Sequence, residues 1–123
     1  MKFHCKITRW GDGALVFLDD PNANFIIIFN DDAPEELVEF SVLHTEAGCS
    51  EDPAVGDTVI VCGKQFTITA IGDEAIHTLR SLGHCTLSFK GGTAAERPGC
   101  IMLQGDVPLA KDDIKSGAAI EIH

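Results

Sequence analysis

The residue best suited to group-transfer chemistry is His44, which closes the alternating run Phe40-Ser41-Val42-Leu43-His44-Thr45. A neutral imidazole is nucleophilic near pH 7. A strand that ends at a polar, glycine-containing loop is expected to hold the backbone of His44 rigid and to leave the imidazole ring near solvent. Taken alone, a histidine in this position is more often packed or solvated than reactive. The elements around the run must therefore decide its role.

No other pattern of catalytic or cofactor-binding residues accompanies His44. The sequence has neither a GxGxxG nor a GxxxxGK[ST] segment, so no nucleotide cofactor is expected, and GxSxG and HExxH segments are also missing. Its cysteines are odd in number, scattered and without Cys-x-x-Cys spacing, which fits neither a disulfide scaffold nor a structural zinc site. We expect reduced thiols at all five positions: Cys5, Cys49, Cys62, Cys85 and Cys100.

Composition indicates a single domain over residues 1–123, with 45% hydrophobic residues to form one core. The 19 acidic and 9 basic residues give a formal net charge of −10, which disfavours nucleic acid and favours a partner with a basic surface. Apolar runs such as 25–29 are too short to cross a bilayer, and the first residues do not form a secretion signal. A cytoplasmic protein without membrane insertion is expected.

Short apolar or alternating runs separated by turn residues predict a mainly β protein. Gly63-Lys64 is expected to join two of these strands as a tight hairpin. The predicted strands cover residues 3–10, 14–18, 25–29, 40–45, 58–62, 65–71, 84–89, 100–103 and 118–122.

One helix is predicted over about residues 73–82. Asp73 is placed to cap its free amides, and Gly83 supplies the left-handed stop. An apolar stripe at helical spacing should pack on the core: Ala75, Ile76, Leu79 and Leu82. A shorter helical turn is expected over residues 34–38. With about six to nine strands, the fold class is a closed or partly rolled β-barrel, which closes within one chain or across a homodimer.

The order and spacing of several short motifs resemble one bacterial family over nearly the full length. The first motifs are Ile7-Thr8-Arg9-x-Gly11, Ala33-Pro34 and the histidine after residues 40–43. The block from Phe66 to Gly99 contains Thr69-Ala70-Ile71-Gly72, residues 79–89 and Arg97-Pro98-Gly99, and Gly105-x-Val107-Pro108 closes the pattern. In this order they resemble the glucitol/sorbitol-specific IIA component of the bacterial sugar phosphotransferase system.

The resemblance implies a phosphoryl relay. A IIA component of this family takes a phosphoryl group from the carrier protein HPr and passes it to the IIB part of the glucitol/sorbitol permease. The position that matches the phosphorylated histidine is His44. A phosphoramidate keeps a high transfer potential, and transfer between two docked proteins asks mainly for positioning and charge stabilisation.

Three neighbours are candidates to assist a phosphoryl group on His44. We expect His84 to approach the ring and donate a hydrogen bond or orient it, although a structural role for His84 fits equally well. Thr45 offers a hydroxyl for the same purpose. Members of the family often carry a second histidine two residues after the acceptor, where this chain has Glu46. That carboxylate is a candidate to fix the imidazole tautomer instead.

Two other function classes stay open at this stage. A non-catalytic β-barrel regulatory or binding module would keep the fold without needing His44. A metal-dependent enzyme using His44, His84 and nearby acids lacks recognisable ligand spacing, so no metal is expected.

Overall fold

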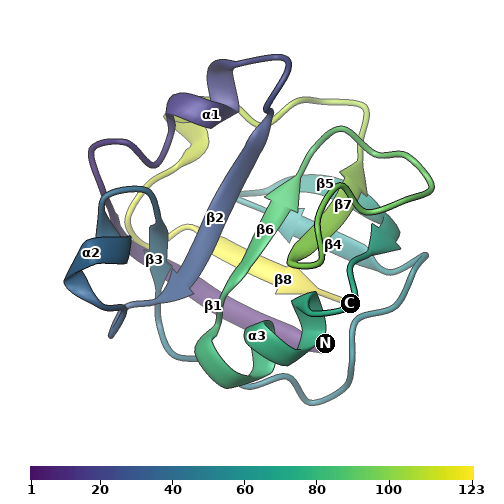
Figure 1. Ribbon diagram of the computed structural model, residues 1–123, viewed down its shortest axis with the longest axis horizontal. Coiled ribbons are helices and arrows are strands. Elements are labelled where there is room, and N and C mark those ends of the chain that lie inside the picture. The colour runs from purple at the N-terminus through teal and green to yellow at the C-terminus, as the bar shows by residue number, and fades with distance from the viewer.

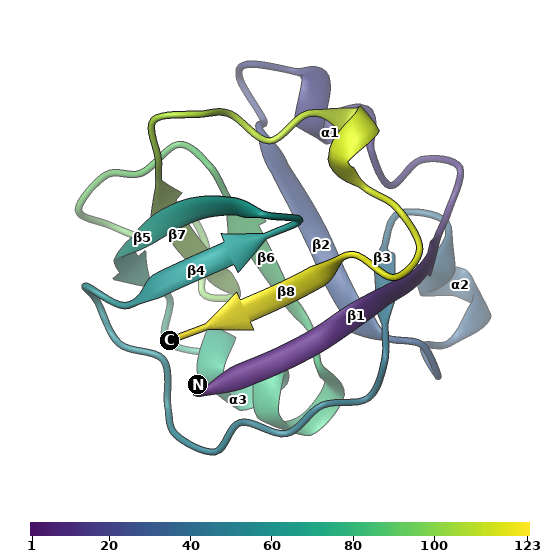
Figure 2. The ribbon, with the colours of Figure 1, turned by 180° about the vertical axis from the view of Figure 1, so that it is seen from behind.

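The computed structural model, which describes residues 1–123, is built around an eight-stranded β-barrel that closes within one chain (Figure 1, Figure 2). Around the barrel the strands follow the order β1-β3-β2-β6-β7-β5-β4-β8. Their bounds are β1 Phe3–Trp10, β2 Phe25–Asn30, β3 Val42–His44, β4 Thr58–Val61, β5 Lys64–Ile71, β6 Cys85–Ser88, β7 Cys100–Gln104 and β8 Ala119–Ile122. The predicted β-barrel is confirmed, in its closed form.

Three short α-helices and one 3-10 turn complete the chain: α1 Val16–Asp19, α2 Glu35–Val38, α3 Ala75–Leu82 and η1 Lys111–Asp113. The predicted helix and the predicted turn at residues 34–38 are confirmed as α3 and α2. The side-chain cap predicted at Asp73 is wrong, because the helix begins at Ala75 after Glu74 and no side chain caps it. Gly83 does end the helix, with φ 62°; its N–H donates to the carbonyl of Leu79, and the N–H of His84 donates to that of Thr78.

The strand predicted over residues 14–18 is also wrong, because this run forms the helical turn α1. Ala14 and Leu18 are buried while Val16 is 59% exposed. Residues four apart lie on the same face in a helix and in a strand, so the burial of Ala14 and Leu18 is compatible with either. A short wholly apolar run cannot distinguish the two.

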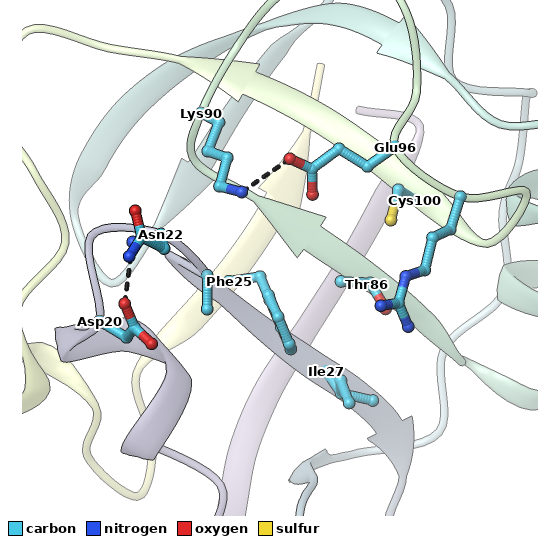
Figure 3. Close-up of a pocket in the computed structure, with 10 residues that line it drawn as sticks. Asp20, Asn22, Phe25, Ile27, Thr86, Lys90, Glu96 and Cys100 are labelled. Carbon is cyan, nitrogen blue, oxygen red and sulfur yellow. Dashed lines mark hydrogen bonds and ion pairs between the residues drawn. The ribbon is translucent and has the colours of Figure 1, made fainter.

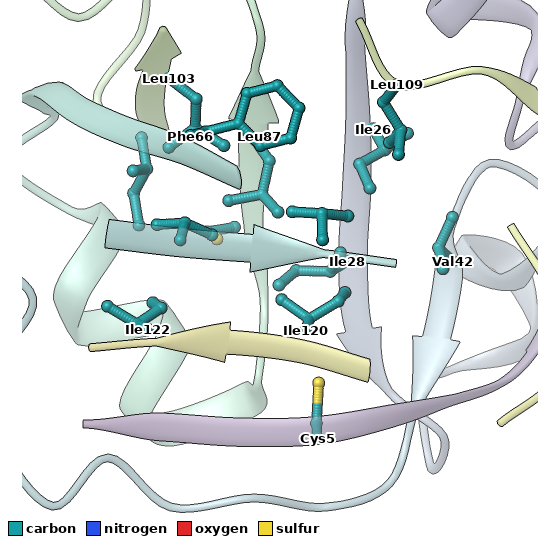
Figure 4. Close-up of a cluster of buried hydrophobic side chains, with 14 of the residues drawn as sticks. Cys5, Ile26, Ile28, Val42, Phe66, Leu87, Leu103, Leu109, Ile120 and Ile122 are labelled. Carbon is teal, nitrogen blue, oxygen red and sulfur yellow. The ribbon is translucent and has the colours of Figure 1, made fainter. Parts of the chain in front are cut away.

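One apolar core fills the barrel, because alternate residues of each strand point inward (Figure 4). On β1, for example, Phe3, Cys5 and Ile7 are buried while the residues between them are not. Ala75 and Leu79 of α3 belong to the same core. Helix α3 therefore closes one end of the barrel, beside the start of β1 (Figure 2).

Strand pairing is antiparallel except at two places, where β2 pairs with β3 and β6 pairs with β7 in parallel. The β2–β3 pair is joined by the crossover that contains α2, and its register sets Asn30 opposite His44. The predicted hairpin is present between β4 and β5. Its turn is Cys62-Gly63, one residue earlier than expected, and both residues have positive φ, as a type I′ turn requires.

All five cysteines are free thiols. Burial raises the pKa of Cys5 to about 12 and, together with the nearby Asp113 carboxylate, that of Cys62 to about 11. Burial also raises the pKa of Cys49, Cys85 and Cys100. None of the helices has the length and apolar character needed to cross a membrane.

Candidate functional site

His44 ends β3 with its side chain inside the barrel. Its Cα pairs with Ile7 of β1 on one side and Asn30 of β2 on the other. The ring is 0% exposed and meets Phe3 edge-on, with centroids 6.0 Å apart and planes at 86°. The expectation of a ring near solvent is therefore wrong. Residue 44 shares the inward face of β3 with the core residue Val42, and the turn after α3 covers it.

Each ring nitrogen of His44 faces a main-chain carbonyl oxygen. Nδ1 lies 2.8 Å from the oxygen of Thr45, and Nε2 lies 2.7 Å from the oxygen of Gly83. A neutral imidazole has one N–H and one lone pair, so it can donate to only one of them. Both contacts can be hydrogen bonds only when both ring nitrogens carry a proton. One carbonyl must therefore withdraw before a ring nitrogen can act as a nucleophile.

Gly83 and Asn30 complete the surroundings of the His44 ring. A Cβ atom at Gly83 would overlap Oδ1 of Asn30 and come within 2.8 Å of Cε1 of His44. The Asn30 side chain is 6% exposed, and its buried Oδ1 has no hydrogen-bond partner. Sequence analysis did not single out Asn30, because only the parallel pairing of β2 with β3 brings it to His44.

The His84 side chain makes no hydrogen bond to the His44 ring. Its Nδ1 lies 3.1 Å from the carbonyl oxygen of Ile28, and its ring packs against Phe29 with centroids 4.6 Å apart. The group from this segment that reaches His44 is the carbonyl of the preceding Gly83. Because a carbonyl accepts, Nδ1 of His84 carries a proton, and in the neutral ring the lone pair is then on Nε2.

Thr45 and Glu46 are both exposed at the start of the loop that follows β3. Thr45 is tied to β1, since its Oγ1 accepts the Lys6 N–H at 3.0 Å and its own N–H donates to the Lys6 carbonyl at 2.8 Å. These bonds fix the position of the Thr45 carbonyl that faces Nδ1 of His44. Thr45 thus touches the ring through its main chain, and its hydroxyl is engaged elsewhere.

His44 lines none of the four main surface cavities, two of which adjoin β2. The larger, about 570 Å³, is mostly apolar and contains His84, Phe40 and Arg97. The smaller, about 320 Å³, is shown in Figure 3, where Lys90 is paired with Glu96 at 2.8 Å. No group of three or more His, Cys, Asp or Glu side chains is placed to hold a metal ion, so the metal-dependent alternative has no ligand set.

The fold is that of a IIA component of the sugar phosphotransferase system. A crystal structure of such a component from Enterococcus faecalis V583 is similar to this chain with a TM-score of 0.74 and 23% identity, over 96% of this chain and 97% of that one. At this identity the likeness establishes the fold alone.

The sequence establishes the family. Residues 2–121 match the family described as PTS system glucitol/sorbitol-specific IIA component. Relatives described as PTS system glucitol/sorbitol-specific EIIA component, from Escherichia coli K12 and Shigella flexneri, are each 33% identical over 121 residues, covering 98% of this chain and 94% of theirs. The chain belongs to this family, and the predicted resemblance is confirmed. It is a phosphotransferase relay component that works with other proteins of the system.

Proposed function

We propose that His44 receives a phosphoryl group from phospho-HPr in the cytoplasm and passes it to a cysteine on the IIB part of a glucitol/sorbitol permease. The observation that carries this proposal is the burial of an imidazole, 0% exposed, inside an apolar barrel. An aliphatic side chain would fill that position at lower cost, because a buried polar ring must be compensated by hydrogen bonds. Such a cost is typical of a functional residue.

The chemistry needs one lone pair of the His44 ring. A ring nitrogen attacks phosphorus, the bond from phosphorus to the donor's imidazole breaks, and its electron pair returns to the donor ring. The other nitrogen keeps its proton and its bond to a main-chain carbonyl, which holds the ring in place. Access requires local opening, either of the turn at Gly83 or of the loop that begins at Thr45.

His84 is a second candidate for the phosphoryl acceptor. With Nδ1 bound to the Ile28 carbonyl, its Nε2 has a lone pair and no hydrogen-bond partner within the protein. The ring lines the outer cavity with Arg97, whose guanidinium group suits a phosphoryl oxygen. Unlike His44, His84 needs no opening before reaction.

The test is incubation with phosphoenolpyruvate, enzyme I and HPr, followed by mapping of acid-labile, base-stable phosphate. We expect His44→Gln to lose the label while His84→Gln and the control His77→Gln keep it. His77 is an exposed helix histidine. Label that survives in His44→Gln and disappears in His84→Gln would assign the acceptor to His84. An unlabelled wild-type protein would contradict the relay itself.

Sugar selectivity in this proposal resides in the permease, so the chain itself needs no polyol site. The barrel closes within one chain, so no second copy is needed to complete it. If the proposal is right, transfer from phospho-HPr proceeds at the same rate in the presence and absence of sugar. Any effect of glucitol appears only when the membrane partner is added.

A further inference from the structure

Asn30 is the polar side chain that the barrel places beside the His44 ring. The two residues are opposite each other in the parallel β2–β3 pair, so neighbouring strands project them from the same end of the barrel. Both side chains also converge on Gly83. A Cβ atom there would overlap Oδ1 of Asn30 and come within 2.8 Å of Cε1 of His44. The carboxamide and the Cε1 edge of the ring, which lies between the two ring nitrogens, therefore both border Gly83.

The Asn30 carboxamide is left unsatisfied in the unphosphorylated protein. The side chain is 6% exposed, and Oδ1 is buried without a hydrogen-bond partner. An unpaired buried acceptor is destabilising, and an apolar residue would fit the end of an apolar barrel better. The side chain is therefore expected to gain its partner in another state of the protein.

We propose that Asn30 binds the phosphoryl group while it is on His44, an inference that rests on His44 being the acceptor. When a ring nitrogen bonds to phosphorus, it can no longer face a carbonyl as a donor, and phosphoryl oxygens take up the adjacent space. A half-turn of the carboxamide about its Cβ–Cγ bond exchanges Oδ1 for the Nδ2 donor. Nδ2–H then donates to a phosphoryl oxygen. No proton is transferred and no bond to Asn30 forms.

The type of donor suits a relay. A neutral amide forms a weaker bond to the phosphoryl group than a guanidinium or ammonium group does, so the group stays easy to pass on. No lysine or arginine pairs with His44 or Asn30 in the structure. Gly83 supplies the room that this arrangement needs, since any side chain at that position would occupy the space between the ring and the carboxamide.

The first experiment measures how far Asn30 variants are phosphorylated at equilibrium with phospho-HPr. Asn30→Ala removes the donor, and Asn30→Ser returns a smaller one. We expect the phosphorylated-to-free ratio to fall about tenfold in Asn30→Ala, with partial recovery in Asn30→Ser, as the loss of one hydrogen bond predicts. The matched control is Asn22→Ala, which changes an exposed asparagine of the outer cavity and should leave the ratio unchanged (Figure 3).

A second measurement uses the wild-type protein and needs no variant to fold. The side-chain ¹⁵N–¹H₂ signals of Asn30 and Asn22 are compared by NMR before and after phosphorylation, together with the ³¹P shift of the phosphohistidine. We expect the Asn30 signals to move strongly and those of Asn22 to stay in place. A labelled His44 with unmoved Asn30 signals and a wild-type ratio in Asn30→Ala would overturn the role of Asn30 and leave the relay intact. Label on another residue would instead overturn the assignment of His44, and the role of Asn30 with it.

Discussion

At the scale of single residues, His44 is held in place by the same contacts that would block the reaction proposed for it. The carbonyls of Thr45 and Gly83 fix the ring plane, and each of them lies against a nitrogen that a phosphorus atom would have to reach. A positioned nucleophile gains from such a fixed ring. The cost is that one contact must open first, so local opening at the barrel end becomes a step of the proposed relay.

The thiols provide a prediction at the same scale. Burial, with Asp113 nearby, raises the pKa of Cys62 from 9.0 to about 11. Since only the thiolate reacts with alkylating agents, the alkylation rate of Cys62 in the folded protein should keep rising with pH up to about 11. A thiol with the ordinary pKa levels off near 9. Mass spectrometry of each cysteine after timed alkylation gives both profiles.

The denatured protein is the control for the alkylation profile. There, Cys5 and Cys62 should both level off near 9.0, because burial is lost. In the folded protein, Cys5 should react more slowly than Cys62, since it is 1% exposed and its pKa is raised to about 12. A native Cys62 profile that levels off near 9 would show that its thiol is not shielded as the structure has it.

At the scale of elements, local sequence pattern predicted most of the barrel and little of the site. The strict alternation of residues 3–10 and the turn residues around β4 and β5 are short-range signals, and they gave correct strands. Helix α1 was not predicted, because its short and wholly apolar run shows no hydrophobic periodicity that would distinguish a helix from a strand. The neighbours of His44 could not be predicted either. Asn30 and Gly83 reach it through parallel pairing and a helix packed across the barrel end, which depend on contacts distant in sequence.

Gly83 links the end of α3 to the candidate site, and Gly83→Ala tests that link. Its φ of 62° is unfavourable for alanine, and the added Cβ would overlap Asn30 and crowd the His44 ring. We expect unfolding to become easier by about 2–4 kcal/mol, from the left-handed backbone and the overpacking together. Phosphorylation of His44 should also decrease, since the ring must shift. Denaturant unfolding and phosphate labelling measure the two effects.

Gly92→Ala is the matched control for this glycine. Gly92 also has a positive φ, 93°, but a Cβ there would meet no atom within 4 Å. Its replacement should therefore cost only about 1 kcal/mol, from the backbone alone, and leave phosphorylation unchanged. If both variants lose the same stability and neither loses labelling, the close packing around Gly83 has no functional consequence.

At the scale of the whole molecule, charge is distributed unevenly along the chain. Between Arg9 and Lys64 there are twelve Asp and Glu residues and no Lys or Arg. This segment includes α2, which leads into β3 and His44 (Figure 1). Two apolar side chains are exposed beside its acidic residues, Leu37 at 44% and Phe40 at 47%. A partner with a basic surface and apolar contacts would be complementary to this region.

The last prediction is that electrostatic attraction speeds the encounter with phospho-HPr. Raising salt from about 0.05 to about 0.5 M should slow phosphoryl transfer by roughly tenfold, because exposed charges are screened. The double variant Glu35→Gln/Glu36→Gln on α2 should be slower than wild type at low salt and less sensitive to salt. Rapid-quench measurement of transfer gives these rates.

The control is the double variant Asp106→Asn/Asp112→Asn, which removes the same charge from the β7–β8 connection, at the barrel end opposite α3, and should have a smaller effect (Figure 2). Equal slowing by both pairs would mean that net charge alone matters, and a rate independent of salt would contradict electrostatic steering altogether.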